Sequence, residues 1–519
     1  MSISLPVKQS LATGSPGRAW DTQGVASCYD AVVVGSGPNG LTAAITLARS
    51  GLSVLVVEAQ SGIGGGLRSA EDTLPGFVHD RGATVHALAL ASPVMRSIPL
   101  AEHGVRLAHP PHPLAHPLDG GRAVLAHRDV AATAAGLGPD ERSYLRLMGP
   151  LVDASDEILA DVLAPARVPR HPVALARFGV RGAWSSNALG QLLFGTEEAE
   201  ALLAGAAAHS MLPLSSPLSA AVGLVLGMTA HSVGWPVAVG GSQSVADALA
   251  SYLRTLGGTV RTDHPVVTLG DLPRAAVVML DTPPSTVLRL AGPSLPAGYR
   301  RRLERFRYGA GVFKIDWALD GPVPWTHPEV ARAATVHLGG TRGEISAAEA
   351  EVMRGGHPRQ PYVLLVQPTV ADPSRAPAGR HTLWAYTHVP AGSPVDMTAR
   401  VEAQIERFAP GFRDRVLARR TWSPADLERS NPSLLRGVIS GGSQDLRQVF
   451  TRPVGLRQVL DPYPVPAVSG SRVGRARARL FLCSSSTPPG GGAHGMSGYW
   501  AARSALTGVF GLTPPPPGR

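Results

Sequence analysis

The fold is decided by residues 29–58, which read YDAVVVGSGPNGLTAAITLARSGLSVLVVE. Residues 29–34 are nearly all apolar, as is typical of a strand buried on both faces of a parallel sheet. We expect a helix over 39–49, with Gly51 placed to end it, and a second strand over 53–58. A strand, a helix and a strand of these lengths form one βαβ unit, so the sequence predicts an α/β fold with a Rossmann-like domain.

The turn between this strand and helix is Gly35-Ser36-Gly37-Pro38-Asn39-Gly40, a G-x-G-x-x-G pattern. Gly35 allows the tight turn, Gly37 lets the backbone approach a pyrophosphate, and Gly40 lets the helix pack close to the strand. The pyrophosphate would meet free N–H groups and the positive end of the helix dipole. Pro38 and Asn39 complete this predicted cofactor-binding turn.

Glu58 lies 23 positions after Gly35, at the end of the second strand. An acid at this place accepts hydrogen bonds from the ribose hydroxyls of a dinucleotide. Its charge would repel a 2′-phosphate, which argues against NADP. A second match, Gly490 to Gly495, has too little chain after it for another nucleotide fold, so we expect one dinucleotide site.

Another glycine cluster follows Glu58 directly: Gly62-Ile63-Gly64-Gly65-Gly66-Leu67-Arg68-Ser69. Here the chain resembles the flavin-containing amine oxidase and phytoene dehydrogenase superfamily, whose G-G-x-x-R-[ST] element reaches towards FAD. The resemblance implies that Gly65, Gly66 and Arg68 bind FAD. The spacing is one residue tighter than in that element unless Gly64-Gly65 is taken as the glycine pair.

The C-terminal segment Ser486-Thr487-Pro488-Pro489-Gly490-Gly491-Gly492-Ala493-His494-Gly495-Met496 resembles the phytoene-dehydrogenase-like branch, in which it lies along the ribityl chain and the flavin edge. The resemblance covers about residues 29–510. The cofactor-binding residues that we expect in addition are Val266, Thr487, Gly491, Gly492, His494, Gly495 and Met496. Related flavoproteins often place an acid just before this segment. Ser484, Ser485 and Ser486 stand there instead, so FAD is expected to be held less tightly.

The chain has 519 residues, too many for one ordinary core, and we expect two domains. The FAD-binding domain is discontinuous, from 28–110, 225–290 and 470–510, and an α+β substrate domain takes 111–224 and 291–469. Residues 1–27 are expected to be a flexible leader and 511–519 a flexible tail. The pattern predicts helices over 140–231 and 496–509, and strands over 259–269, 276–280, 311–319, 362–367, 381–388 and 480–483.

Lys314 is the candidate catalytic residue. Only Lys8 and Lys314 are lysines among the 48 basic residues, and an ammonium is a compact charge with a tunable pKa, unlike a guanidinium. The segment 309–325 resembles the amine-oxidase stretch in which a lysine holds a water at the flavin N5. The alternative is a structural lysine paired with Asp316, which lies on the same face of the strand. His79, His86 and His494 are weaker candidates.

The composition excludes several classes of function. Dispersed arginines and few aromatic residues argue against a nucleic-acid partner, although the net charge of +10 leaves room for peripheral contact with an anionic membrane. Two cysteines without a C-x-x-C exclude disulfide-reductase chemistry, and no metal site is expected. The longest apolar stretch, 220–230, is too short to span a bilayer, so we expect a cytoplasmic protein.

The predicted function is therefore FAD-dependent oxidation, with hydride transfer between flavin and an apolar small-molecule substrate. An isoprenoid or carotenoid-like substrate is implied by the resemblance alone. A flavin amine oxidase is the first alternative, and a non-catalytic FAD-binding protein is the second. The apolar run 218–228 would either line a substrate tunnel or form a buried core helix.

Overall fold

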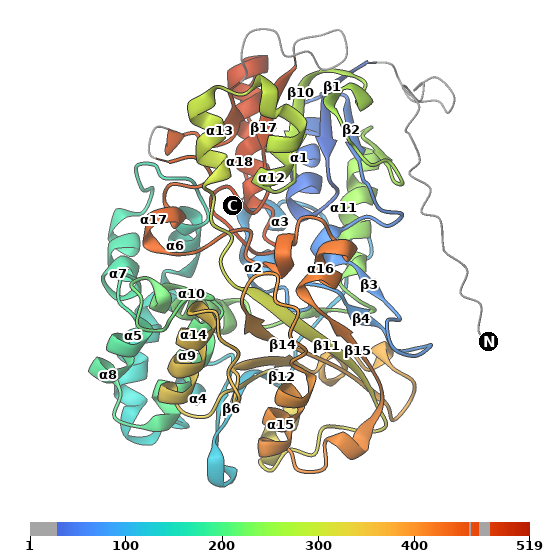
Figure 1. The fold of residues 1–519 in the computed structure, drawn as a ribbon. Coiled ribbons are helices and arrows are strands. Elements are labelled where there is room, and N and C mark those ends of the chain that lie inside the picture. The colour runs from blue at the N-terminus through green and yellow to red at the C-terminus, as the bar shows by residue number, and fades with distance from the viewer. Residues whose placement is uncertain (1–27, 456–457, 467–477, 519) are drawn as a thin grey trace, which may run out of the picture.

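The structure is a computed structural model that describes residues 28–455, 458–466 and 478–518. Two sheets dominate this part of the chain, one in the upper half and one in the lower half of Figure 1. The leader predicted over 1–27 lies outside the described residues, as does the segment 467–477.

The first sheet has six strands and is parallel except at one edge. Its strands, in spatial order, are β16 (Pro464–Val465), β17 (Arg479–Leu482), β10 (Arg274–Leu280), β1 (Cys28–Val34), β2 (Val54–Val57) and β9 (Thr259–Arg261). Only β16 is antiparallel to its neighbour. The predicted α/β fold with a Rossmann-like parallel sheet is confirmed.

Helices cover both faces of this sheet because its strands are apolar on both sides. Ala31 and Val33 of β1 face one core, shared with α1 (Pro38–Ala48), α11 (Gln243–Thr255) and α18 (Met496–Ala505). Val32 and Val34 face the other core, shared with α12 (Pro284–Ala291) and α13 (Ala297–Glu304). The sequence assigned α13 to the substrate domain, but its apolar face packs on the first sheet.

The second sheet has seven strands: β15 (Val416–Trp422), β11 (Gly311–Leu319), β14 (His381–Val389), β13 (Val363–Val366), β12 (Ala333–Leu338), β6 (His112–Pro117) and β7 (Ala123–Ala126). All neighbours are antiparallel except β12 and β6. α15 (Thr398–Phe408) packs on one face of it. α9 (Glu197–Ala208) and α14 (Arg342–Met353) pack on the other.

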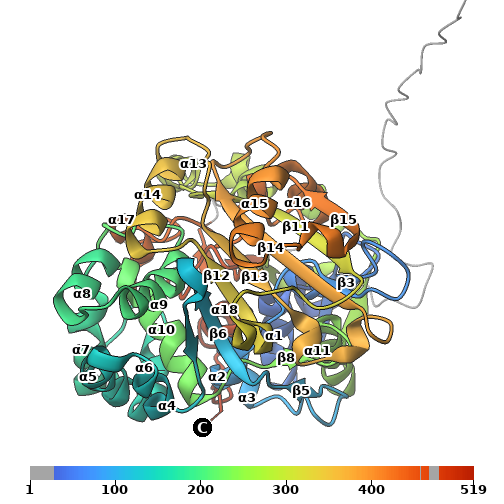
Figure 2. The same ribbon diagram turned by 90° about the horizontal axis from the view of Figure 1, so that it is seen from below.

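The remaining helices form a group beside the second sheet, coloured teal to green in Figure 2: α4 (Val130–Ala135), α5 (Glu141–Asp153), α6 (Ser155–Val162), α7 (Pro172–Gly182), α8 (Ser186–Leu193) and α10 (Ser219–Ser232). Short elements complete the chain: α2 (Ala87–Ala91), α3 (Pro93–Arg96), α16 (Pro424–Ser430), α17 (Leu446–Val449), and the pairs β3 (Ser69–Ala70) with β4 (His79–Asp80) and β5 (Leu107–Ala108) with β8 (Val237–Ala238). None of the described helices meets the length and apolarity that a bilayer span requires.

Two sequence-based boundaries differ from the structure. The strand expected over 259–269 ends at Arg261, because Asp263 adopts a left-handed φ of 53° and Pro265 follows it. The helix expected over 496–509 is α18 only to Ala505 and continues as a π-helical turn over Leu506–Phe510. The strands β6, β7, β12 and β15 were not predicted.

The C-terminal helix α18 crosses α1 at very close range. A Cβ atom on Gly498 would lie 1.9 Å from the carbonyl oxygen of Asn39. Only glycine permits this approach, and it brings the C-terminal segment against the start of α1.

We therefore expect Gly498→Ala to destabilise the protein by roughly 1–3 kcal/mol, because the two backbones must separate. Gly508→Ala is the matched control, since no atom lies within 4 Å of its added Cβ. It should change the free energy of unfolding by less than about 0.5 kcal/mol. Denaturant unfolding of both variants checks this, and equal stabilities would contradict the close crossing.

Candidate functional site

A cavity of about 1220 Å³ lies between the two sheets. Its floor includes the carboxyl ends of parallel strands of the first sheet, at Val34, Val57, Asp281 and Ser484. Its opposite wall includes Lys314, Trp384 and Tyr386 of the second sheet. In open α/β sheets ligands bind at the carboxyl edge, where the strand order reverses, and β1 occupies that place here between β2 and β10.

The predicted glycine turn forms part of this cavity wall. Gly35, Gly37, Pro38 and Asn39 line the cavity, whereas Gly40 lies behind them. A Cβ on Gly40 would lie 2.2 Å from the carbonyl oxygen of Gly35, so the close packing of helix on strand does require glycine. Gly35 has a φ of 101°, which other residues rarely adopt.

Asn39 carries an unsatisfied group at this turn. Its amide nitrogen donates to Ser485 Oγ at 3.4 Å. Its Oδ1 is buried and has no hydrogen-bond partner within the described part of the chain. Buried polar atoms in native proteins are almost always paired, so this oxygen is suited to a donor group on a ligand.

Glu58 lines the cavity at the end of β2 and is fixed by the turn itself. Its Oε2 accepts from the backbone N–H of Ser36 at 3.0 Å and from the hydroxyl of Ser36 at 2.6 Å. Its Oε1 accepts from the N–H of Gln60. Val266 lines the cavity beside it, because His264 N donates to the carbonyl of Glu58 at 2.8 Å and holds the segment after β9 at this edge.

Gly65, Gly66 and Arg68 also line the cavity. A Cβ on Gly65 would lie 3.1 Å from the Cα of Gly37, so the second glycine cluster packs against the first. The Arg68 guanidinium donates to the carbonyl of Ser430 at the end of α16, at 3.3 Å. Burial and the neighbouring Arg81 lower the pKa of Arg68. Arg68 therefore joins the second glycine cluster to the end of α16 at the cavity wall.

Asp281, which was not predicted from the sequence, is a second carboxylate bonded to the glycine turn. It follows β10, and its Oδ2 accepts from the N–H of Gly40 in the first turn of α1 at 2.9 Å. The same oxygen lies 2.6 Å from where a Cβ on Gly37 would stand. Burial raises the pKa of Asp281 to about 7, opposed by the N–H of Gly40 and reinforced by the Glu58 carboxylate. The carboxyl is therefore largely neutral below pH 7.

The C-terminal segment forms another part of the wall. Ser484, Ser485 and Ser486 line the cavity together with Gly491, Gly492 and His494. Thr487, Gly495 and Met496 lie behind this surface: Thr487 Oγ1 donates to Ser484 O at 2.8 Å, and a Cβ on Gly495 would lie 2.6 Å from Thr42. Gly495 therefore packs the segment against α1, and Thr487 holds the turn within the segment.

No carboxylate forms an ion pair with Arg452 in the described residues, although this arginine is buried behind the serines. Its guanidinium donates to the carbonyls of Ser485 and Ser443, both at 3.2 Å. Burial lowers the pKa of Arg452 to about 10, while Asp445 opposes the change. It joins the segments 440–443 and 484–486, which both border the cavity.

Lys314 lies on β11 with its ammonium at the cavity wall. It donates to Asp316 Oδ1, as the alternative interpretation of the sequence proposed, and lies 5.3 Å from the ring centre of Trp384. Asp316 Oδ2 also accepts from the indole N–H of Trp422 at 2.7 Å. Lys314 therefore has the ion-pair partner that the alternative interpretation expected and also lines the cavity.

The candidate histidines have separate places. His79 and His86 do not line the cavity: His79 bonds to Thr73 Oγ1 at 2.7 Å, and His86 bonds to Ser242 Oγ at 2.9 Å. His494 does line it, and its Nδ1 accepts from the N–H of Met496. Burial lowers the pKa of His494 to about 4 and that of His209, another lining residue, to about 3, so both imidazoles are neutral.

The far part of the cavity is apolar. Val222, Val225 and Leu226 of α10 line the cavity, as does Leu218 just before the helix. Leu224 and Met228, on the other side of α10, are fully buried in the core. The run 218–228 thus serves as tunnel wall on one face and as core on the other. α7 contributes Leu175 and Phe178 to the same wall.

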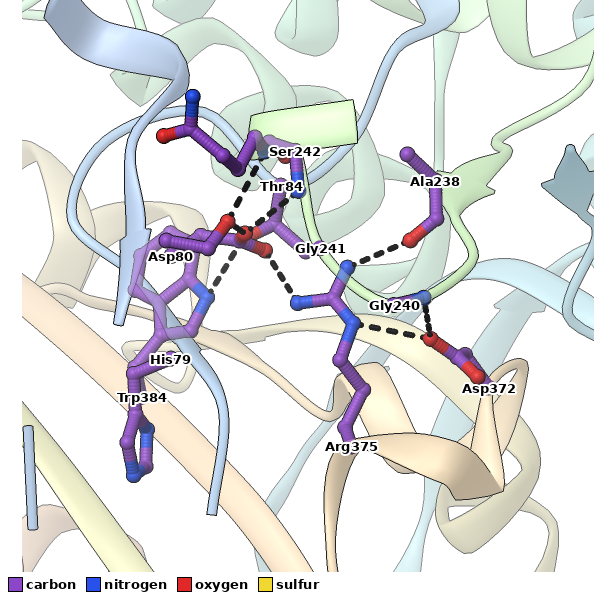
Figure 3. Close-up of polar contacts among 12 residues, drawn as sticks. His79, Asp80, Thr84, Ala238, Gly240, Gly241, Ser242, Asp372, Arg375 and Trp384 are labelled. Carbon is purple, nitrogen blue, oxygen red and sulfur yellow. Dashed lines mark hydrogen bonds and ion pairs between the residues drawn. The ribbon is translucent and has the colours of Figure 1, made fainter. Parts of the chain in front are cut away.

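A buried ion network joins β4, β8 and residues 372–375 beside the cavity (Figure 3). Arg375 donates to Asp80 at 2.7 Å, to Asp372 at 3.0 Å and to the carbonyl of Ala238 at 2.8 Å. Burial alone would raise the pKa of Asp80, but the Arg375 charge and the Ser69 hydroxyl lower it to about 2. Asp80 Oδ2 also accepts from Thr84, whose hydroxyl receives the indole N–H of Trp384.

Comparisons with known proteins agree with this architecture. Residues 33–98 match the family model described as an NAD(P)-binding Rossmann-like domain. The mouse protein named pyridine nucleotide-disulfide oxidoreductase domain-containing protein 2 is 29% identical, over 91% of this chain and 92% of its own length.

Two solved structures resemble nearly the whole chain. An oxidoreductase from Methanosarcina mazei has a TM-score of 0.57 and 16% identity, covering 92% of this chain and 99% of its own. Putrescine oxidase bound to putrescine has a TM-score of 0.57 and 20% identity, covering 93% and 99%. The chain shares the fold of these two proteins.

The raised pKa of Asp281 makes stability depend on pH. An unfolded aspartate has a pKa near 3.9, so between about pH 4 and pH 7 the native carboxyl keeps a proton that the unfolded chain loses. The stabilisation that the protonated Asp281 carboxyl contributes is therefore lost as the pH rises from about 4 to about 7, and it does not return at higher pH. Asp281→Asn keeps an acceptor for Gly40 without the charge.

The melting temperature of Asp281→Asn is compared with that of the unmodified protein at each pH. We expect this difference to be about 2 °C or more higher at pH 8 than at pH 5. Asp247→Asn, at an exposed position on α11, is the control and should show no such difference. Thermal unfolding across this pH range measures both. A constant offset for Asp281→Asn would contradict the assignment of a buried, protonated carboxyl.

Proposed function

We propose that this protein is an FAD-dependent oxidoreductase of the phytoene dehydrogenase-like type, transferring hydride between flavin and an apolar substrate. The observation that carries the proposal is the single cavity of about 1220 Å³ that begins at the glycine turn and ends between the apolar faces of α7 and α10. Pockets for one small ligand usually occupy about 300–1,000 Å³. This cavity has room for a dinucleotide and for a substrate beyond it.

The residues at the first end fit FAD. The turn Gly35 to Asn39 and the start of α1 would hold the diphosphate, and Glu58 would accept the hydroxyls of the adenosine ribose. The unpaired Oδ1 of Asn39 offers an acceptor to the cofactor. Gly491 and Gly492 of the C-terminal segment border the same space. Ser484 and Ser485 supply hydroxyls where related flavoproteins place an acid.

Bound FAD would supply a hydride acceptor, so the side chains need only position the substrate and control protons. The walls from α7 and α10 exclude water from the substrate end. Lys314 would hold a water or a proton at the boundary between the two ends, with Asp316 neutralising its charge. His209 and His494 are neutral and add no charge to this surface.

A flavin amine oxidase is the second candidate, favoured by the aromatic pair Trp384 and Tyr386 beside Lys314. Their rings are stacked, with centres 6.0 Å apart and planes at 21°. Two aromatic rings that enclose a substrate between them would need about 7 Å between their planes, which is twice the usual contact distance. This pair forms one continuous aromatic surface on one side of the cavity. The apolar substrate is therefore preferred.

The first test is the visible spectrum of the purified protein, followed by identification of any dye released on denaturation. Bound FAD that bleaches with a reductant and recovers in air is the expected result. A protein that binds no FAD contradicts the proposal, and bound FAD that no donor reduces favours a non-catalytic binding role. Product analysis with polyenes and with amines then separates the two oxidoreductases, and turnover of amines alone would favour the second candidate.

Lys314→Met should slow the reoxidation of reduced flavin by oxygen by about tenfold, which corresponds to ~1.4 kcal/mol of barrier. Asp316→Asn is the matched control, because it weakens the same ion pair but keeps the ammonium. Stopped-flow reoxidation after photoreduction measures both. Unchanged kinetics in Lys314→Met, or equal slowing in the two variants, would remove Lys314 from the active site.

A further inference from the structure

Exposed apolar side chains gather on one segment of the molecule. Among the described residues thirteen large apolar side chains are exposed, and five of them lie between Val168 and Leu192. They are Val168 (89% exposed), Val173 (64%), Val180 (66%), Trp184 (44%) and Leu192 (59%). Single exposed apolar residues are ordinary, but a cluster of this kind marks an interaction surface.

Their spacing places three of them on one face of α7 and its C-terminal end. Val173, Val180 and Trp184 follow one another at seven and four positions, which is the repeat of one helical face. The opposite face carries Ala174, Phe178 and Gly182, which are buried. Both views place α7 and α8 at the same outer edge of the molecule (Figures 1 and 2). The helix is therefore apolar towards the protein and also towards solvent.

The charge on this segment has one sign. Residues 162–196 contain four arginines and no aspartate or glutamate. Arg167 pairs with Asp161 of α6 at 3.2 Å. Arg170, Arg177 and Arg181 form no ion pair with any described residue. Glu157 of α6 lies near this segment, 4.0 Å from His171. Three arginines without ion-pair partners among the described residues lie beside an exposed apolar face. This combination suits an anionic lipid bilayer, whose headgroups are charged and whose interior is apolar.

The same helix is also a wall of the cavity. Leu175, Phe178 and Gly182 of α7 line it from the inside, opposite the exposed face. We propose that α7 and the flanking residues 168–192 dock in the plane of an anionic lipid surface, with Val173, Val180 and Trp184 inserted and the arginines at the headgroups. Resting on the proposed function, this would bring the apolar end of the cavity to the phase in which an apolar substrate dissolves.

Vesicle flotation of the full-length protein tests the docking. The probes are vesicles of phosphatidylcholine alone and of phosphatidylcholine with phosphatidylglycerol. We expect the protein to float with the anionic vesicles and to be released by high salt. Val173→Ser/Val180→Ser/Trp184→Ser should weaken partitioning by roughly tenfold or more, because the inserted apolar area is lost. Arg170→Gln/Arg177→Gln/Arg181→Gln should remove the preference for anionic lipid.

The matched control is Leu417→Ser/Leu446→Ser, which removes two exposed apolar side chains from β15 and α17. It should float like the unmodified protein, and circular dichroism checks that all variants fold. Failure of the unmodified protein to float, or equal loss in the control, overturns the proposal. So does a dimer, seen by analytical ultracentrifugation, that the triple serine variant abolishes without any vesicle binding.

Flavin content measured in the same fractions separates this proposal from the proposed function. A protein that floats without flavin supports docking and contradicts the FAD assignment. A protein that holds flavin and never floats contradicts docking alone.

Discussion

The cavity depends on one buried charge, the guanidinium of Arg375. This side chain is fully buried and joins Asp80 and Asp372 to the carbonyl of Ala238. Removing one member of a buried ion network leaves the others unpaired, at a cost of about 3–5 kcal/mol. Through Asp80 and Thr84 the network also holds Trp384, which stacks on Tyr386 in the cavity wall. The position of Trp384 in the cavity wall therefore depends on a chain of buried contacts that leads to the Arg375 charge.

The glycine turn and its place at the cavity could be predicted from the sequence because the determinants of the turn are local. Gly35, Gly40 and Glu58 act within one βαβ unit, and the physical reason given for Gly40 reappears in the 2.2 Å contact that a Cβ would make. The apolar strands of the same βαβ unit predicted the parallel sheet. Lys314 was singled out for its rarity and Asp316 was named as its possible partner; the structure shows this pair and adds the place of Lys314 on the cavity wall.

Other features could not be predicted from the sequence. Some depend on contacts between residues far apart in the chain, and others lie in segments whose composition is unusual for their structure. β6 reads HPLAHP, with two histidines and two prolines, yet all six residues are buried in the second sheet. β15 carries mostly exposed residues at a sheet edge and lacks a buried repeat. Asp281 and Gly40 meet across 241 positions, and Arg375 and Asp80 across 295, so no local spacing announces either contact. The exposed face of α7 is visible only once burial is known.

The first sheet places β17 beside β10 and packs α18 on α1, so the last part of the chain contacts its first helix. Ser484 to His494 form a wall of the cavity that the glycine turn opens. During synthesis the turn and Glu58 leave the ribosome hundreds of residues before that wall exists. The cavity is therefore complete only after residues 484–494 have been made, and a ligand that touches both walls binds after these distant segments have met rather than guiding the folding of the first βαβ unit.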